Sequence, residues 1–130
     1  MPVGFEATTF SVTDENGVLV IALGAPSTED DDFYLMFQHK EEHSEQDVKF
    51  GMDRPYIEFC GQGWSWYGHM RKVELERKVI RVLMDAEAAQ HMQNNGIIEV
   101  QFSLSDTKFT ELRSALRRTF SRVGYYTDAA

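Results

Sequence analysis

The chain has 130 residues, of which 42% are hydrophobic and 26% charged, and its formal net charge is −8. This size and balance predict a single domain, residues 1–130, in an ordinary soluble protein. No apolar run approaches the roughly 20 residues that cross a bilayer, and no signal-peptide pattern opens the chain. The only cysteine, Cys60, cannot form an internal disulfide. We therefore expect a cytoplasmic protein.

The charge is unevenly distributed. Residues 1–53 hold twelve acids and two bases, a balance of −10, and the remainder balances at +2. A nucleic-acid partner needs a basic face that neutralises phosphates, so this asymmetry argues against one. An acidic half is instead suited to steering a basic protein into place.

In the first half, alternating and apolar runs predict strands over residues 5–12, 18–23 and 33–38, with a short edge strand over 48–52. Asp14 to Gly17 reads as a turn, because Asn-Gly tolerates positive φ at both positions. The loop Ala25 to Asp32 ends in adjacent carboxylates, which must face water. The segment His39 to Glu45 has no apolar residue and predicts an exposed connection.

The stretch from Tyr56 to Met84 is the expected centre of the sheet. It begins with a short apolar run, turns at Gly61-Gln62-Gly63 and continues in two alternating segments. The pattern predicts three consecutive antiparallel strands. Trp64 and Trp66 share one strand face and Tyr67 points to the other; core packing is the ordinary role, but these residue types also anchor protein interfaces.

The last third predicts two helices around a strand. Asp85 is placed to cap a short helix from Ala86 to Met92, and Ser105 a longer one from Asp106 to about Arg122. The strand between them runs from Ile97 to Leu104, and residues 124–130 are expected to fray. The fold class is therefore α+β: an antiparallel sheet of six to eight strands, with the C-terminal amphipathic helix on one face and one short extra helix.

Two catalytic alternatives depend on specific residues. His39, Glu42 and His43 match the inverted zinc-protease pattern, which requires both histidines on one helix face and a third ligand from elsewhere. No apolar positions anchor such a helix here, so we expect a solvated connection. Cys60 with a histidine would be a nucleophile pair, but it ends a strand and has no oriented base in the pattern.

Two further patterns lack the context that binding would need. Gly61-Gln62-Gly63 precedes a strand and not a helix, so it does not form a phosphate cradle. The basic helix after Asp106 is diluted by acids, and its arginines are expected to cover solvated sides.

The ordered patterns together resemble the immunity protein 10 family of small bacterial proteins encoded beside polymorphic toxins. The elements that carry the resemblance are Tyr56-Ile57-Glu58, Trp66-Tyr67-Gly68, Val73 to Leu75, Val79 to Val82, Asp85 to Ala89, Ile97 to Phe102 and Leu112 to Phe120. The match covers most of the chain. Cys60 and the Trp-Ser-Trp segment stand as local variants.

The resemblance implies a protein without catalysis, metal or cofactor that binds and neutralises a cognate toxin domain. We expect a basic toxin to be steered and docked by carboxylates, with Tyr67 as an anchor. The acids concerned are Asp30, Asp31, Asp32, Glu41 and Glu42. Two alternatives remain: a small metal-dependent hydrolase that uses His39, Glu42 and His43, and a homo-oligomeric scaffold in which the aromatic strand pairs with its own copy.

Overall fold

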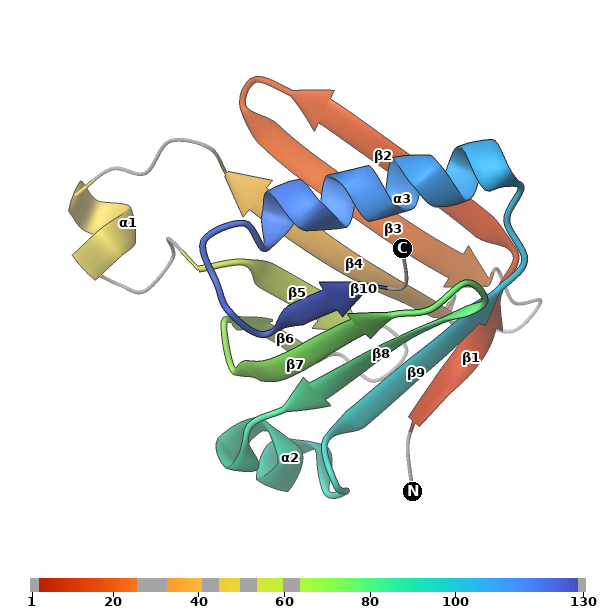
Figure 1. Ribbon diagram of the computed structural model, residues 1–130. Helices are drawn as coiled ribbons and strands as arrows, with labels where there is room; N and C mark the ends of the chain where they lie inside the picture. The colour runs from red at the N-terminus through yellow and green to blue at the C-terminus, as the bar shows by residue number, and fades with distance from the viewer. Residues whose placement is uncertain (1–2, 26–32, 41–44, 50–53, 60–63, 129–130) are drawn as a thin grey trace.

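A computed structural model describes residues 3–25, 33–40, 45–49, 54–59 and 64–128 (Figure 1). The strands are β1 Val3–Ala7, β2 Thr9–Glu15, β3 Val18–Ala25, β4 Phe33–Lys40, β5 Tyr56–Phe59, β6 Trp64–Tyr67, β7 Met70–Leu75, β8 Val79–Met84, β9 Ile97–Phe102 and β10 Tyr126–Asp128. The helices are α1 Glu45–Lys49, α2 Ala86–Met92 and α3 Asp106–Thr119. The α+β class is confirmed.

The strands form two sheets where the sequence predicted one. The first, which we call the antiparallel sheet, has the order β2-β3-β4-β5-β6, and every neighbouring pair in it is antiparallel. The predicted turn between β2 and β3 is confirmed, with φ of 54° at Asn16 and 77° at Gly17. Those left-handed values give the twist that joins two adjacent strands through a two-residue loop.

The second, which we call the mixed sheet, has the order β1-β9-β8-β7-β10. Its outer strands β1 and β10 run parallel to β9 and β7, so the prediction of a purely antiparallel sheet was wrong here. The expected strand over residues 5–12 is two strands that belong to different sheets, separated at Thr8. The apolar alternation changes phase at this break, from Phe5 and Ala7 to Phe10 and Val12, so the sequence contains a signal for the break that the prediction of one strand did not use.

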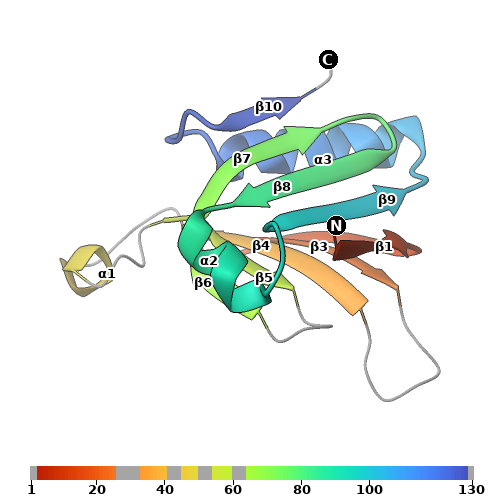
Figure 2. The same ribbon diagram turned by 90° about the horizontal axis from the view of Figure 1, so that it is seen from below.

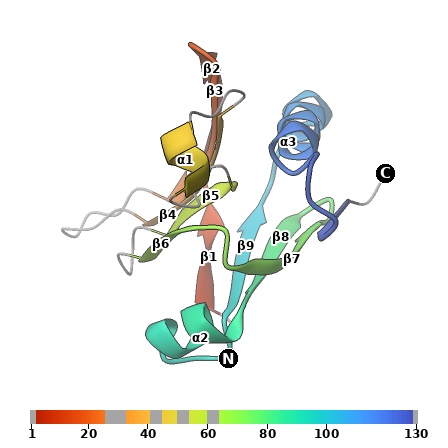
Figure 3. The ribbon, with the colours of Figure 1, turned by 90° about the vertical axis from the view of Figure 1, so that its left-hand side faces the viewer.

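The molecule has two layers, which Figures 2 and 3 show from different sides. The antiparallel sheet is one layer, and the mixed sheet with α3 beside it is the other. α3 contacts β2, β3 and β4, and its Phe120 ring lies edge-on to Phe37 of β4 with the centroids 5.5 Å apart. The predicted apolar stripe is confirmed, because Phe109, Leu112, Leu116 and the capping residue Phe120 are all buried, although α3 ends at Thr119 and not near Arg122.

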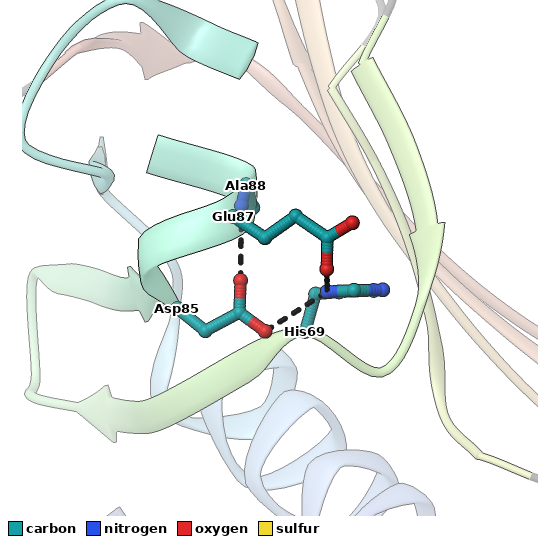
Figure 4. A network of polar contacts seen from close by, with 4 residues as sticks. All are labelled: His69, Asp85, Glu87 and Ala88. Atoms are coloured by element: carbon teal, nitrogen blue, oxygen red, sulfur yellow. Dashed lines mark hydrogen bonds and ion pairs between the residues drawn. The ribbon is translucent and has the colours of Figure 1, made fainter. Parts of the chain in front are cut away.

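The predicted three-stranded meander is interrupted, because the chain leaves the antiparallel sheet after β6 and enters the mixed sheet at β7. Gly68 and His69 make this crossing with φ of 75° and 61°. His69 Nδ1 lies 2.9 Å from Asp85 Oδ2 and 3.7 Å from Glu87 Oε2 (Figure 4). The backbone carbonyl of His69 accepts the Asp85 N–H. These contacts fasten the crossing to the start of α2.

Both predicted helix caps are confirmed. Asp85 Oδ1 accepts the Ala88 N–H at 2.9 Å, and Ser105 Oγ accepts the Lys108 N–H at 3.3 Å. Partial burial raises the pKa of Asp85, but the hydrogen bonds from Ala88 and His69 outweigh it, so that the pKa lies below its usual value.

Two local predictions were wrong. Val48 and Lys49 belong to α1 and not to an edge strand; residues 50–52 of that expected strand lie outside the described ranges. The end of the chain holds β10, although fraying was expected from residue 124. β10 adds to the edge of the mixed sheet and is tied to α3, because Arg117 Nε donates to Asp128 at 2.8 Å.

Candidate functional site: the open face of the antiparallel sheet

The antiparallel sheet buries one face and presents the other outward. Its outward side chains follow from the strand register, and we call them the open face. They are Thr9, Ser11, Thr13, Val18, Val20, Ala22, Tyr34, Met36, Gln38, Tyr56, Glu58, Ser65 and Tyr67. α3 and the mixed sheet both lie on the other side (Figure 3). The outward side of an antiparallel sheet is commonly polar, whereas the centre of this one is apolar and aromatic.

Three tyrosines and one carboxylate occupy the β4–β6 part of the open face. The rings of Tyr56 and Tyr67 are cross-strand neighbours with centroids 4.9 Å apart. The hydroxyl of Tyr56 donates to Glu58 at 2.6 Å, and the hydroxyl of Tyr34 donates to the same carboxylate. Burial, followed by the hydrogen bond to Glu58, raises the pKa of Tyr56 above its ordinary value. The Tyr56 hydroxyl is therefore a neutral donor at physiological pH.

Two hollows flank this cluster at opposite ends of β4. One, of about 220 Å³, is lined by residues that include Ser11, Ala22 and Tyr34. Gly24 lies in its wall, and a Cβ at that position would come within 2.8 Å of Thr9 Oγ1. The other hollow, of about 200 Å³, is lined by residues that include Arg54 and Tyr67. The face thus offers concave places for side chains of a partner as well as apolar area.

The prediction that the two tryptophans and the tyrosine of β6 lie on opposite sides of the strand is confirmed. Trp64 and Trp66 are partly buried and pack against the core, with Trp64 stacked on Phe59 at 6.0 Å and Trp66 edge-on to His91 of α2 at 6.0 Å. Tyr67 lies on the opposite side and is 37% exposed. Tyr67 is therefore the β6 aromatic that a partner can reach on the open face.

The other predicted contact residues are five acids. Asp30, Asp31, Asp32, Glu41 and Glu42 lie outside the described ranges. In the chain, however, Asp32 immediately precedes the first residue of β4 and Glu41 immediately follows its last. The acids thus adjoin, along the sequence, the two ends of a strand that contributes Tyr34, Met36 and Gln38 to the open face.

Of the predicted metal ligands, only His39 lies within the described ranges. It lines a cavity of about 450 Å³ together with Ser114, Arg117, Arg118, Ser121 and Arg122. Three guanidinium groups oppose the binding of a cation there. Glu42, His43 and Cys60 lie outside the described residues. Within those residues, no three His, Cys, Asp or Glu side chains are grouped to hold a metal ion, so no observation favours the hydrolase alternative.

The arginines of α3 make ion pairs within the chain. Arg117 holds Asp128 through two hydrogen bonds of 2.8 and 2.9 Å, and Arg118 contacts Asp14 Oδ2 at 2.9 Å. These pairs connect α3 to β10 and β2, and both arginines remain exposed, as expected from the sequence. None of the described helices is long and apolar enough to cross a membrane.

Sequence reasoning missed Glu58 as a site residue. The signal was available, because Tyr56 and Glu58 alternate with Ile57 and Phe59, which places a carboxylate beside an aromatic on the outward side of a buried strand. The partner Tyr34 comes from β4, 24 positions away, and only the strand register brings the two together.

Comparison with known proteins gives one match. The family model described as Immunity protein 10 matches residues 5–110, which covers most of the chain, from β1 into α3. No curated protein and no solved structure gives a significant match. The matched span contains every strand of the open face, and the resemblance noted in the sequence is confirmed. The chain belongs to the immunity protein 10 family.

Proposed function

We propose that this protein binds a cognate bacterial toxin domain and neutralises it by occlusion, without catalysis of its own and in the cytoplasm. The observation that carries the proposal is the family match over residues 5–110. The open face supports it, because tyrosine, methionine and arginine are the residue types enriched where proteins meet. Tyr34, Tyr56, Tyr67 and Met36 lie on this face, and Arg54 borders its second hollow.

The charge of the chain indicates the character of the partner. With −10 over residues 1–53, the first half attracts a basic protein over a distance set by the ionic strength. A toxin that acts on nucleic acid needs basic residues to grip phosphates. We therefore propose a basic toxin domain, steered by Asp30, Asp31, Asp32, Glu41 and Glu42 and anchored on Tyr67.

Co-expression tests the function. The toxin domain encoded beside this gene should arrest growth when it is expressed alone, and co-expression of this chain should restore growth. Size-exclusion chromatography with light scattering should show a 1:1 complex. Arrested growth with no complex would refute the proposal. The mass of the chain alone tests self-association through β6, which lies at the edge of the antiparallel sheet.

Reversing the charges of Asp30, Asp31 and Asp32 to lysine should slow association with the toxin about tenfold at low salt, with a much smaller change at high salt. The physical reason is that these carboxylates would act before contact, while screening is weak. Stopped-flow measurements at two ionic strengths give the rates. Equal rates for variant and wild type at low salt would remove these three residues from the docking surface.

Replacing Tyr67 by alanine should instead raise the rate at which the toxin dissociates. Loss of a central aromatic anchor costs about 2 kcal/mol of binding free energy, which is roughly a 30-fold faster dissociation. Val48 supplies a matched control, because it is an exposed apolar side chain outside the open face, 58% exposed on α1. Surface plasmon resonance should show fast dissociation for Tyr67→Ala and unchanged dissociation for Val48→Ala. Similar effects of both variants would place the contact elsewhere.

A further inference from the structure

The carboxylate of Glu58 is held in a fixed position within the open face. It lies on β5 between two hydrogen-bond donors, the Tyr56 hydroxyl on its own strand and the Tyr34 hydroxyl on β4. Its cross-strand neighbours are Met36 and Ser65. The side chain is half-buried, so part of its hydration is already replaced by tyrosine hydroxyls.

Half-buried carboxylates on the other sheet have cations beside them. On the outward side of the mixed sheet, Glu99 lies 3.6 Å from Arg81, and Glu74 lies 3.6 Å from Lys72. Within the described parts of the chain, no lysine, arginine or histidine nitrogen lies within 4.0 Å of a Glu58 carboxylate oxygen, the distance that defines an ion pair. It is thus a preorganised carboxylate with hydrogen-bond donors and with no cation among the described residues.

The chain itself shows how such a group is completed. At the end of β10, Asp128 accepts a hydrogen bond from the Tyr126 hydroxyl at 3.0 Å and two more from the guanidinium of Arg117. The Asp128 side chain is only 9% exposed. A buried carboxylate here combines one tyrosine hydroxyl with one arginine, whereas Glu58 has two tyrosine hydroxyls and lacks the arginine.

A protein that covers the open face must supply the missing charge. Docking removes the remaining water from Glu58, and a carboxylate buried without a cation is strongly unfavourable. Arginine suits the position better than lysine, because its planar fork pairs with a carboxylate and its plane stacks on aromatic rings. The rings of Tyr56 and Tyr67, 4.9 Å apart, lie next to the carboxylate on the same face.

We propose that Glu58, with Tyr34, Tyr56 and Tyr67, forms a socket for one arginine side chain of the toxin domain. The inference rests on the proposed function and specifies its contact chemistry. The partner is a protein with an exposed arginine at the centre of its docking surface, and the net charge of −8 on this chain complements it. Glu58 would hold the arginine by a paired charge, and the tyrosines would hold its plane.

The test is Glu58→Gln against Glu74→Gln. Each substitution removes one negative charge from a half-buried strand position, and glutamine still accepts from and donates to tyrosine hydroxyls. Calorimetric titration with an inactivated form of the toxin domain encoded beside this gene should show about 30-fold weaker binding for Glu58→Gln. Glu74→Gln should stay within about twofold of wild type. Thermal unfolding of both variants checks that each is folded.

The possible results of this experiment distinguish a failure of the socket from a failure of the proposed function. If the wild-type chain does not bind the toxin, the proposed function fails and the socket fails with it. If the wild-type chain binds and Glu58→Gln binds within threefold of it, the socket is refuted while the function stands. Equal weakening by Glu58→Gln and Glu74→Gln would also refute the socket, because it would show an effect of net charge alone.

A double-mutant cycle gives the second readout. Each exposed arginine of the toxin is changed to glutamine and titrated against wild type and Glu58→Gln. One arginine should lose about tenfold in affinity against the wild-type chain and almost nothing further against the variant. Independent effects for every arginine would overturn the socket, even if Glu58→Gln weakens binding.

Discussion

The outward faces of the two sheets carry different kinds of side chain at their centres. On the mixed sheet, Arg81 lies across from both Glu74 and Glu99, so charged groups of opposite sign occupy the centre of the face. On the antiparallel sheet, the corresponding centre holds Met36 beside Ala22 and Glu58. The outward side of the antiparallel sheet instead exposes apolar and aromatic side chains, and we propose that a partner covers them.

The inward and outward side chains of a single strand show a similar contrast. Phe37 of β4 points inward and is 1% exposed, whereas its neighbour Met36 points outward on the open face. If the open face serves binding and not folding, the two positions must differ sharply in what they contribute to stability. The predictions that follow test this difference in order of decreasing effect.

The largest effect is expected at Phe37. Replacing it by alanine should lower the free energy of unfolding by about 3–5 kcal/mol, because the ring fills the space between β4 and Phe120 of α3. Replacing Met36 by alanine should cost no more than about 1 kcal/mol, since that side chain is only half-buried. Urea denaturation measures both values. Equal losses would mean that the open face is covered within the folded chain.

A smaller effect is expected from the carboxylate that already has its arginine. The hydrogen bonds from Arg117, followed by that from Tyr126, hold the pKa of Asp128 below its usual value despite partial burial. A lowered folded-state pKa stabilises the protein above the unfolded value of about 3.9, and this contribution is lost as the pH falls further. The Asp128→Asn variant should therefore unfold at a temperature a few degrees lower than the wild type at pH 7. Its unfolding temperature should also change less with pH between about pH 4 and pH 2.

Asp106 provides the control for this titration. Its side chain is 99% exposed and also contacts an arginine, Arg77, at 2.8 Å. Exposed pairs contribute little to stability, so Asp106→Asn should leave the acid limb of the unfolding curve unchanged. A flattened acid limb in both variants, or in neither, would contradict the assignment of the effect to Asp128.

Local signals in the sequence predicted much of the fold. Asn16-Gly17, the caps at Asp85 and Ser105, the apolar stripe of α3 and the alternation after Ile97 each depend on residues that are close in the chain. The division into two sheets depends on which distant strands pair, as when β1 pairs with β9 about 95 positions later. Periodicity contains no information on that choice, so a single sheet was expected.

The candidate site was predictable to the same extent. Alternation along β6 placed Tyr67 opposite the tryptophans, and the structure confirms this opposition. The surroundings of Tyr67 required the register, because Tyr34, Glu58 and Tyr67 come from three different strands. The short segment at Val48 was expected as a strand from its apolar residues and is helical, since five residues carry too little periodicity to distinguish the two.

One pair of variants tests the central claim most directly. Met36→Lys puts a long charged side chain at the centre of the open face, and Val79→Lys does the same at a half-buried outward position of the mixed sheet. Titration of both with the neighbouring toxin domain should show about 100-fold weaker binding, or about 2.7 kcal/mol, for Met36→Lys. Val79→Lys should bind as the wild type does. Unchanged binding by Met36→Lys, or loss of binding by Val79→Lys alone, would contradict the assignment of the toxin contact to the antiparallel sheet.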